Sequence, residues 1–308
     1  MPHALALART FGSNVSLLHV MPPPRAHAGA HTGDAIGWEI SRQETLTHLE
    51  HLEAAMSRSL ARAVEIRLEQ GRPAERIVDV AREMSADLLI VASGGDREPA
   101  GRALGSTAQQ VLGAGRTSVF VARVGATAED QPCVLVPLDG SIRAESVLPA
   151  AARIASAKGA RMVLVHVVEE PLSTAVLTAA DDMKLAQTLA GRLAVNAKRY
   201  LERLQAQLER EDHRLLVRTA VTRHSNKCQS ILAVAESERA TILILSAHGA
   251  GCDSARPAGS VASYLLAHSN TPLLALQDLP ECGIHARAPR AAAQAPTYLH
   301  AGHAVESA

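Results

Sequence analysis

The chain contains 308 residues, which is enough for about two domains of ordinary size. Hydrophobic residues make up 47% of it and aromatic residues only 2%, so aliphatic side chains must build the cores, as in helices packed on a buried parallel sheet. The 31 basic and 31 acidic residues balance, which disfavours nucleic acid or an acidic membrane surface as a partner.

Two further features of the sequence favour a cytoplasmic protein. No apolar run reaches the roughly 18–20 residues that span a bilayer, and the first 21 residues show no signal peptide. The four cysteines, Cys133, Cys228, Cys252 and Cys282, show no CxxC spacing. We therefore expect reduced thiols.

Helical and strand-like patterns alternate along the first half of the chain. An Ala- and Leu-rich segment ends at Gly12, as a helix with a glycine cap does, and Leu46, Leu49 and Met56 recur at helical spacing. The predicted elements are a helix at 2–10, a strand at 14–21, a loop at 22–37, a helix at 39–63, a strand at 64–68, a helix at 74–84, a strand at 87–92, a helix to about residue 112 and a strand at 117–124.

The second half repeats this alternation, which predicts parallel sheets with right-handed crossovers. The predicted elements are a strand at 133–138, a helix at 145–157, a strand at 161–168, a loop or short helix at 172–180, a helix at 181–211, a strand at 215–221, a helix at 230–237, a strand at 241–245, a helix at 261–267 and a strand at 272–276. We expect core packing for the apolar stripe of the long helix, which comprises Leu185, Leu189, Leu193, Tyr200 and Leu204.

The two halves are copies of one another. Residues 2–20 align with 149–167 at an offset of 147, so that Gly12 matches Gly159 and His19 matches His166. Residues 77–117 align with 231–271 at an offset of 154. We therefore predict one domain at 1–125 and a second at 132–280. Residues 281–308, rich in Ala, His, Pro and Arg without periodicity, are predicted to be a disordered tail.

The first copy lacks one element of the second. The strand at 134–138, which ends at Asp139, would align with residues ahead of Met1. Without it the neighbouring strands lack a partner, at about 1–3 kcal/mol for each buried polar group left unpaired. Two explanations stay open: the natural start lies upstream, or the first copy is a degraded repeat retained as a scaffold.

Each copy carries a glycine-rich loop between a buried strand and a helix. Gly249 and Gly259 stand ten residues apart, and Ser260 follows the second. The first copy repeats this pattern with Gly95, Gly105 and Ser106. Backbone N–H groups and the positive end of the helix dipole at such a loop favour an anion. The alternative is a tight strand-to-helix turn that holds no ligand.

With these motifs, the chain resembles a tandem universal stress protein of the UspA-like class. The nucleotide-binding branch of that family has Gly, two residues, Gly, nine residues, Gly, and then Ser or Thr. Both copies follow this pattern except at its first glycine, where Ser246 and Ala92 stand. The resemblance covers about residues 1–280. It implies an α/β fold of two tandem parallel five-stranded sheets with helices on both faces, of the Rossmann-like or HUP type, the first lacking its opening strand.

The resemblance also implies ATP or another adenine nucleotide, with or without Mg²⁺, at the carboxyl ends of the strands. The implied binding residues in the second copy are Pro137, Asp139, Val167, Ser246, Gly249, Gly259, Ser260 and Val261. Gly95, Gly105 and Ser106 form a second, incomplete set in the first copy. In the family the last strands pair two domains, so 117–124 and 271–276 are expected to pair within this chain. Assembly into a homodimer stays open.

Several candidate residues have simpler interpretations. Asp139 is explained equally by a helix cap or a turn. His166, at a strand end, favours packing over ligand binding. His48 and His51 are three residues apart on a charged helix, without the further Cys or Asp ligands of a metal site, so no metal is predicted.

These features together predict a stress-response regulatory module that binds ATP in its second copy and signals by conformation or by docking a partner. The alternatives are a nucleotide-free adaptor and an ATP-cleaving enzyme on a related scaffold. No motif places a general base, and the Walker A, GxGxxG and GxSxG patterns are missing from the sequence. We therefore expect at most slow ATP hydrolysis.

Overall fold

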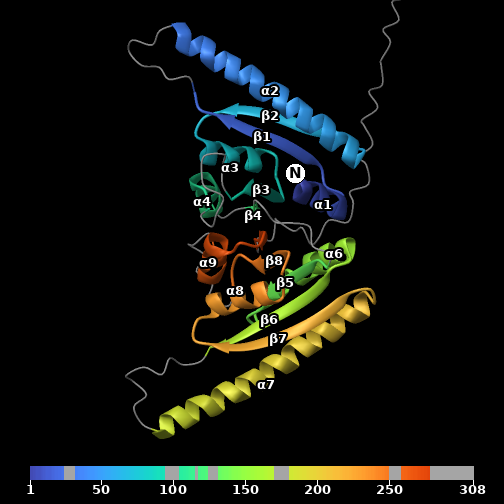
Figure 1. Cartoon of the computed structure of the whole chain (residues 1–308), viewed down its shortest axis with the longest axis vertical. Coiled ribbons are helices and arrows are strands. Elements are labelled where there is room, and N and C mark those ends of the chain that lie inside the picture. The colour runs from blue at the N-terminus through green and yellow to red at the C-terminus, as the bar shows by residue number, and fades with distance from the viewer. Residues whose placement is uncertain are drawn as a thin grey trace, which may run out of the picture.

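The computed structural model describes residues 1–23, 32–93, 104–114, 117–123, 131–169, 180–249 and 258–277. Strands and helices alternate along them, as the sequence predicts (Figure 1). The strands are β1 (Val15–Met21), β2 (Val64–Gln70), β3 (Leu88–Ala92), β4 (Ser118–Ala122), β5 (Cys133–Pro137), β6 (Arg161–Glu169), β7 (Leu216–His224), β8 (Ile242–Ser246) and β9 (Leu273–Leu276). The helices are α1 (Pro2–Phe11), α2 (Thr32–Leu60), α3 (Pro73–Glu83), α4 (Ser106–Gly113), α5 (Ile142–Glu145), α6 (Leu148–Lys158), α7 (Ala180–Glu211), α8 (Lys227–Ser237) and α9 (Ser260–His268).

The second repeat forms the predicted five-stranded parallel sheet, in the order β9-β8-β5-β6-β7. β5 lies at its centre and is buried on both faces, because side chains of a strand alternate between faces and helices cover each face here. Val134 and Val136 enter one core, together with α1, α6 and α7. Cys133 and Leu135 enter the other, together with α4, α8 and α9.

The four strands of the first repeat do not form one continuous sheet, although the sequence predicted a single sheet for each repeat. Its four strands divide into a two-stranded sheet, β1-β2, and a pair, β3-β4, that joins the sheet of the second repeat. In the second repeat β5 lies between β8 and β6, and the described residues of the first repeat contain no strand between the corresponding β3 and β1. The two strand pairs of the first repeat are therefore not joined to each other.

The two repeats pair through their last strands, as predicted. β4 runs antiparallel to β9, with Phe120 opposite Leu274, and this pairing makes one seven-stranded sheet (Figure 1). Two side-chain hydrogen bonds reinforce the seam: Arg123 Nη2 donates to the Leu266 carbonyl at 2.5 Å, and Ser118 Oγ accepts from the Gln277 amide at 3.1 Å.

Matching helix ends confirm that the halves are structural copies. α1 and α6 both have proline in their first turn, and both end at a glycine in the left-handed conformation, Gly12 at φ 64° and Gly159 at φ 59°. Their cap amides donate to equivalent carbonyls, those of Ala8 and Ala155. Glycine adopts this conformation without the penalty that a Cβ imposes.

Several predicted boundaries were wrong, and three of them affect how the helices begin. α2 begins at Thr32, inside the predicted loop at 22–37. The predicted helix at 145–157 is two helices: Ser141 caps α5, and α6 restarts with a proline in its first turn, where no amide donor is needed. α8 begins at Lys227 rather than residue 230, because the Asn226 side chain accepts from the Gln229 amide and caps the helix there.

The apolar stripe of α7 is buried along only part of its length, which corrects the expectation of core packing throughout. Leu204 is 4% exposed, whereas Leu185 is 69% exposed, and Leu189 and Leu193 are also exposed. A helix of 32 residues is about 48 Å long, and its neighbour β7, with nine residues, about 30 Å. The amino-terminal part of α7 therefore extends past the sheet (Figure 1). None of the described helices is both long and apolar enough to cross a membrane.

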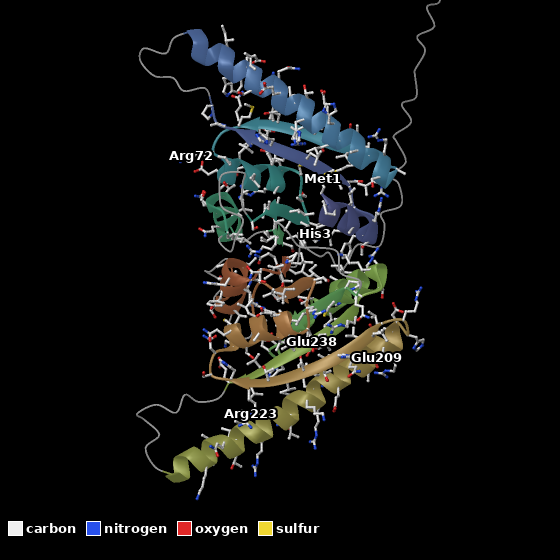
Figure 2. The ribbon with its side chains drawn as sticks, viewed as in Figure 1. Met1, His3, Arg72, Glu209, Arg223 and Glu238 are labelled. Carbon is white, nitrogen blue, oxygen red and sulfur yellow. The ribbon has the colours of Figure 1, made fainter. Side chains whose placement is uncertain are left out.

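We predict that His3 makes stability depend on pH. Its ring lies 5.2 Å from that of Phe120, between α1 and β4 (Figure 2 labels His3), and burial, followed by the charge of Lys158, lowers its pKa. The unfolded chain therefore binds a proton at His3 more readily than the folded protein does. The contribution of neutral His3 to the free energy of unfolding is complete above about pH 6.5 and is lost as the pH falls below that value.

Urea unfolding at about pH 7.5 and 5.5 measures this dependence. His3→Gln should lose less stability than the wild type over the same interval. Equal losses in both proteins would rule out His3 as the source.

Candidate functional site

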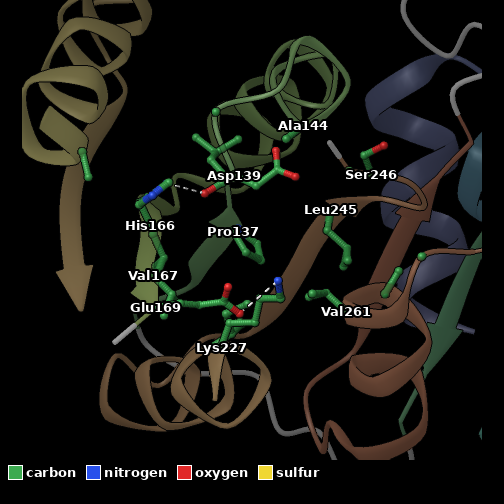
Figure 3. A pocket seen from close by; sticks show the side chains of 18 of the residues that line it. Pro137, Asp139, Ala144, His166, Val167, Glu169, Lys227, Leu245, Ser246 and Val261 are labelled. Atoms are coloured by element: carbon green, nitrogen blue, oxygen red, sulfur yellow. Dashed lines mark hydrogen bonds and ion pairs between the residues drawn. The ribbon is translucent and has the colours of Figure 1, made fainter. Parts of the chain in front are cut away.

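A cavity of about 800 Å³ opens at the carboxyl ends of β5, β6 and β8 (Figure 3). This volume lies within the usual range for small-molecule sites, and the position is the usual one for ligands of open parallel sheets. All eight residues predicted for the second repeat line it: Pro137, Asp139, Val167, Ser246, Gly249, Gly259, Ser260 and Val261.

Asp139 follows β5, and the turn after it holds its carboxylate in place. Its Oδ1 accepts from the Ser141 amide at 3.0 Å and from Ser141 Oγ at 2.6 Å. Ser141 Oγ in turn accepts from the Ala144 amide and caps α5. Asp139 is therefore an acid of the turn before the helix, while Ser141 is the cap.

Gly249 is the point at which the loop after β8 meets the carboxylate of Asp139. A methyl group on Gly249 would lie 2.3 Å from Oδ2 of Asp139, so a side chain at position 249 would require the end of the Asp139 side chain to move. Their contact joins two parts of the chain 110 residues apart at one wall of the cavity.

The helix α9 begins at the cavity. The Gly259 amide donates to the Ala247 carbonyl at 2.7 Å, which closes the loop, and Ser260 and Val261 form the first turn of the helix. Amide groups of a first helical turn have no acceptor within their own helix, and they lie at the positive end of its dipole. This wall of the cavity therefore suits an anion.

β6 supplies a mostly apolar wall. Val167 lines the cavity, and His166 precedes it. The Nδ1 atom of His166 lies 2.8 Å from the Leu138 carbonyl, a bond that ties β6 to the turn before Asp139 (Figure 3). His166 thus ties two elements together and also lines the cavity, so the expectation of packing rather than ligand binding stays a prediction.

Tyr200 of α7 lines the cavity and did not figure among the predicted site residues. Its hydroxyl oxygen is buried near Glu145, and its ring meets that of His166 edge to face, with centroids 6.2 Å apart. Burial, followed by the charge of Glu145, raises the pKa of this hydroxyl. The hydroxyl therefore stays protonated at neutral pH.

Lys227 and Glu169 form a second feature that the sequence did not reveal. Lys227, in the first turn of α8, lies 3.1 Å from a Glu169 carboxylate oxygen at the end of β6, and both residues line the cavity (Figure 3). The pair is partly exposed, so its strength is modest. It places an ammonium group and a carboxylate at the rim opposite Asp139.

In the first repeat the corresponding loop is described only in part. The Gly105 amide donates to the Ser93 carbonyl at 2.7 Å, as Gly259 does in the second repeat, and Ser106 begins α4. Gly95, one of the three residues predicted for this repeat, lies outside the described residues. Within the described parts of the chain, no cluster of three or more His, Cys, Asp or Glu could hold a metal ion.

A sequence model of one family matches both halves of this fold, at residues 2–123 and 133–277, and its description is the universal stress protein family. The chain belongs to the universal stress protein family. No curated protein matches the sequence.

Solved structures of universal stress proteins share the fold of both repeats. The chain is similar to a universal stress protein from Archaeoglobus fulgidus, with 16% identity, 89% of each chain covered and a TM-score of 0.57. It is also similar to a putative universal stress protein from Pseudomonas aeruginosa, with 15% identity, 87% of this chain and 94% of the other covered, and a TM-score of 0.53.

Proposed function

We propose that the second repeat of this universal stress protein binds ATP or a related adenine nucleotide in the cavity beside Asp139. The observation that carries the proposal is the contact between the Asp139 carboxylate and Gly249. Gly249, where a side chain would displace the carboxylate, lines the same cavity as the fixed carboxylate of Asp139 and the amino terminus of α9.

Each part of a nucleotide finds matching chemistry in the cavity. The first turn of α9, at Ser260 and Val261, suits the phosphates. Val167 and the apolar end of β5 suit the base. A carboxylate such as Asp139 suits a ribose hydroxyl, as acidic residues do in other nucleotide-binding sheets. With Mg²⁺, which is usually held by one or two carboxylates and the phosphates, Asp139 and Glu169 are the candidates at the rim.

The biological role that follows is regulation by occupancy. Nucleotide would bridge the carboxyl ends of β5 and β8 and the amino end of α9. A partner protein would distinguish the nucleotide-bound form from the nucleotide-free form as part of a stress response.

Calorimetric titration with ATP, ADP and AMP tests the proposal. One site per chain is expected, and Asp139→Asn should weaken binding by at least about tenfold, since hydrogen bonds to charged groups contribute about 1.5–3 kcal/mol. Asp212→Asn is the matched control, because Asp212 also accepts a serine hydroxyl bond but lies outside the cavity lining.

Two outcomes would contradict the proposal. A wild-type protein that shows no heat of binding at millimolar nucleotide would favour the nucleotide-free adaptor. Equal affinities for Asp139→Asn and wild type would place the ligand elsewhere.

A further inference from the structure

Lys227 and Glu169 form the ion pair at the rim of the cavity, and the fold itself requires neither residue. Lys227 is the first residue of α8, and Pro73 is the first residue of its copy, α3. Glu169 is the last residue of β6, and at the offset of 147 its copy is Pro22, just after β1. The first repeat forms the corresponding strand and helix without either charge, so the pair belongs to the second repeat and its cavity.

Lys227 begins a helix that packs against α9. α8 contacts both β6 and α9, and Ile231 of α8 shares a core with Val261 and Ala262 of α9. Lys227 lies one helical turn before Ile231 on the same face, and both line the cavity. Figure 3 shows the Lys227 side chain directed into the cavity, where its ammonium group meets the Glu169 carboxylate. Lys227 therefore enters the cavity from the helix next to the one whose amino terminus suits phosphates.

The charges that line the cavity make Lys227 important for an anionic ligand. Among the described lining residues, Asp139 and Glu169 are the acids, and Lys227 is the one lysine or arginine. Two carboxylates repel the phosphates of a nucleotide, and an ammonium group offsets part of that repulsion. Lysine is a usual partner of phosphate oxygens, which it binds as a point charge.

The ion pair is weak enough for Lys227 to exchange its partner. The side chains of Lys227 and Glu169 are 45% and 57% exposed, so water screens their attraction. A terminal phosphate group carries more negative charge than a carboxylate and offers three acceptor oxygens. It therefore competes well with Glu169 for the ammonium group.

We propose that Lys227 binds the phosphates of the nucleotide, and that Glu169 is the partner it leaves when they arrive. The inference rests on the proposed function, because it concerns the same cavity. Lys227 then favours ligands that carry phosphates, while Glu169 opposes binding of the same ligands. Opposite effects of the two residues distinguish this exchange from a structural ion pair, whose loss has the same effect whichever residue is replaced.

Calorimetric titration of the full chain with ATP in EDTA tests the exchange, since EDTA keeps Mg²⁺ away from Glu169. Lys227→Gln should weaken ATP binding by at least about tenfold, the loss expected for hydrogen bonds to a charged group. Glu169→Gln should strengthen ATP binding by about two- to fivefold, because the competitor for Lys227 is removed. The matched control is the exposed pair Lys198–Glu202 of α7, which lies outside the cavity lining. Lys198→Gln and Glu202→Gln should leave ATP affinity unchanged.

The outcomes separate failure of the exchange from failure of the proposed function. Equal ATP affinities for Lys227→Gln and wild type would overturn the exchange and leave the nucleotide site intact. Unchanged or weaker binding in Glu169→Gln would also overturn it, because Glu169 would then not compete with the phosphates. Binding that requires Mg²⁺ would do the same, since a metal ion rather than Lys227 would neutralise the phosphates. A wild-type protein that binds ATP neither in EDTA nor with Mg²⁺ would refute the proposed function itself, and the exchange with it.

Discussion

Phe120→Ala is expected to reduce the free energy of unfolding by about 3–5 kcal/mol, the usual cost of removing a buried phenylalanine ring. Phe120 is 0% exposed and lies in β4 opposite Leu274 of β9. Its core contains residues of both repeats, including Leu7 and Ile154. The cavity left by alanine therefore lies between the two repeats, and filling it would require residues of both repeats to move.

Urea unfolding followed by circular dichroism measures this loss. The matched control is Phe11→Ala, because Phe11 is the second of the two phenylalanines and is only partly buried, with the Arg153 guanidinium 5.2 Å above its ring. Phe11→Ala should reduce the free energy of unfolding by less than Phe120→Ala does. Equal losses for the two variants would mean that the seam carries no special share of the stability.

Gly249→Val is expected to weaken ATP binding by roughly 10–150-fold, the equivalent of one hydrogen bond to a charged group, about 1.5–3 kcal/mol. The valine Cβ would lie 2.3 Å from Oδ2 of Asp139, so the carboxylate must move from its present position in the cavity wall. Folding should change less than binding, because the side chain that moves is a terminal carboxylate at a cavity.

Gly191→Ala is the control for adding a side chain in the same repeat. Gly191 lies within α7, and a methyl group there meets no atom within 4 Å. It should stabilise the protein by about 0.5–1 kcal/mol and leave nucleotide affinity unchanged. Titration of both variants with ATP separates loss of the site from general effects of glycine replacement, and unchanged affinity in Gly249→Val would refute the role of this contact.

The strands were the most predictable part of the fold. β5 and β8 were predicted within one residue of their ends, because a strand buried on both faces is a short, unbroken apolar run. The duplication added independent support, since each element could be predicted twice. The prediction that β4 pairs with β9 came from the family resemblance, because apolar strands alone do not specify their neighbours, and the antiparallel direction is seen only in the structure.

Periodicity was less informative about the long helices. It correctly marks one face of α7 as apolar, but it cannot tell how far the helix extends past its sheet, and Leu185 and Leu189 are exposed for that reason. Helix starts depended on short polar caps, and Asn226 is one whose importance became visible only through its bond to the Gln229 amide.

The candidate site was predicted in part, and the division has a physical reason. Residues next to a glycine loop or a strand end, such as Asp139 and Gly259, carry a local signal, because backbone geometry demands particular residue types there. Tyr200 and Lys227 reach the cavity from helices remote in sequence, and their types are ordinary for helix surfaces. Only packing reveals them.

The antiparallel seam has a consequence for how the molecule divides on unfolding. Hydrogen bonds and a shared core bind β3 and β4 to the second repeat, whereas β1 and β2 form a separate pair beneath α2, and isolated two-stranded sheets are marginal. The cooperative unfolding units therefore do not coincide with the two sequence repeats. β1, β2 and α2 can unfold by themselves, whereas β3 and β4 unfold together with the second repeat.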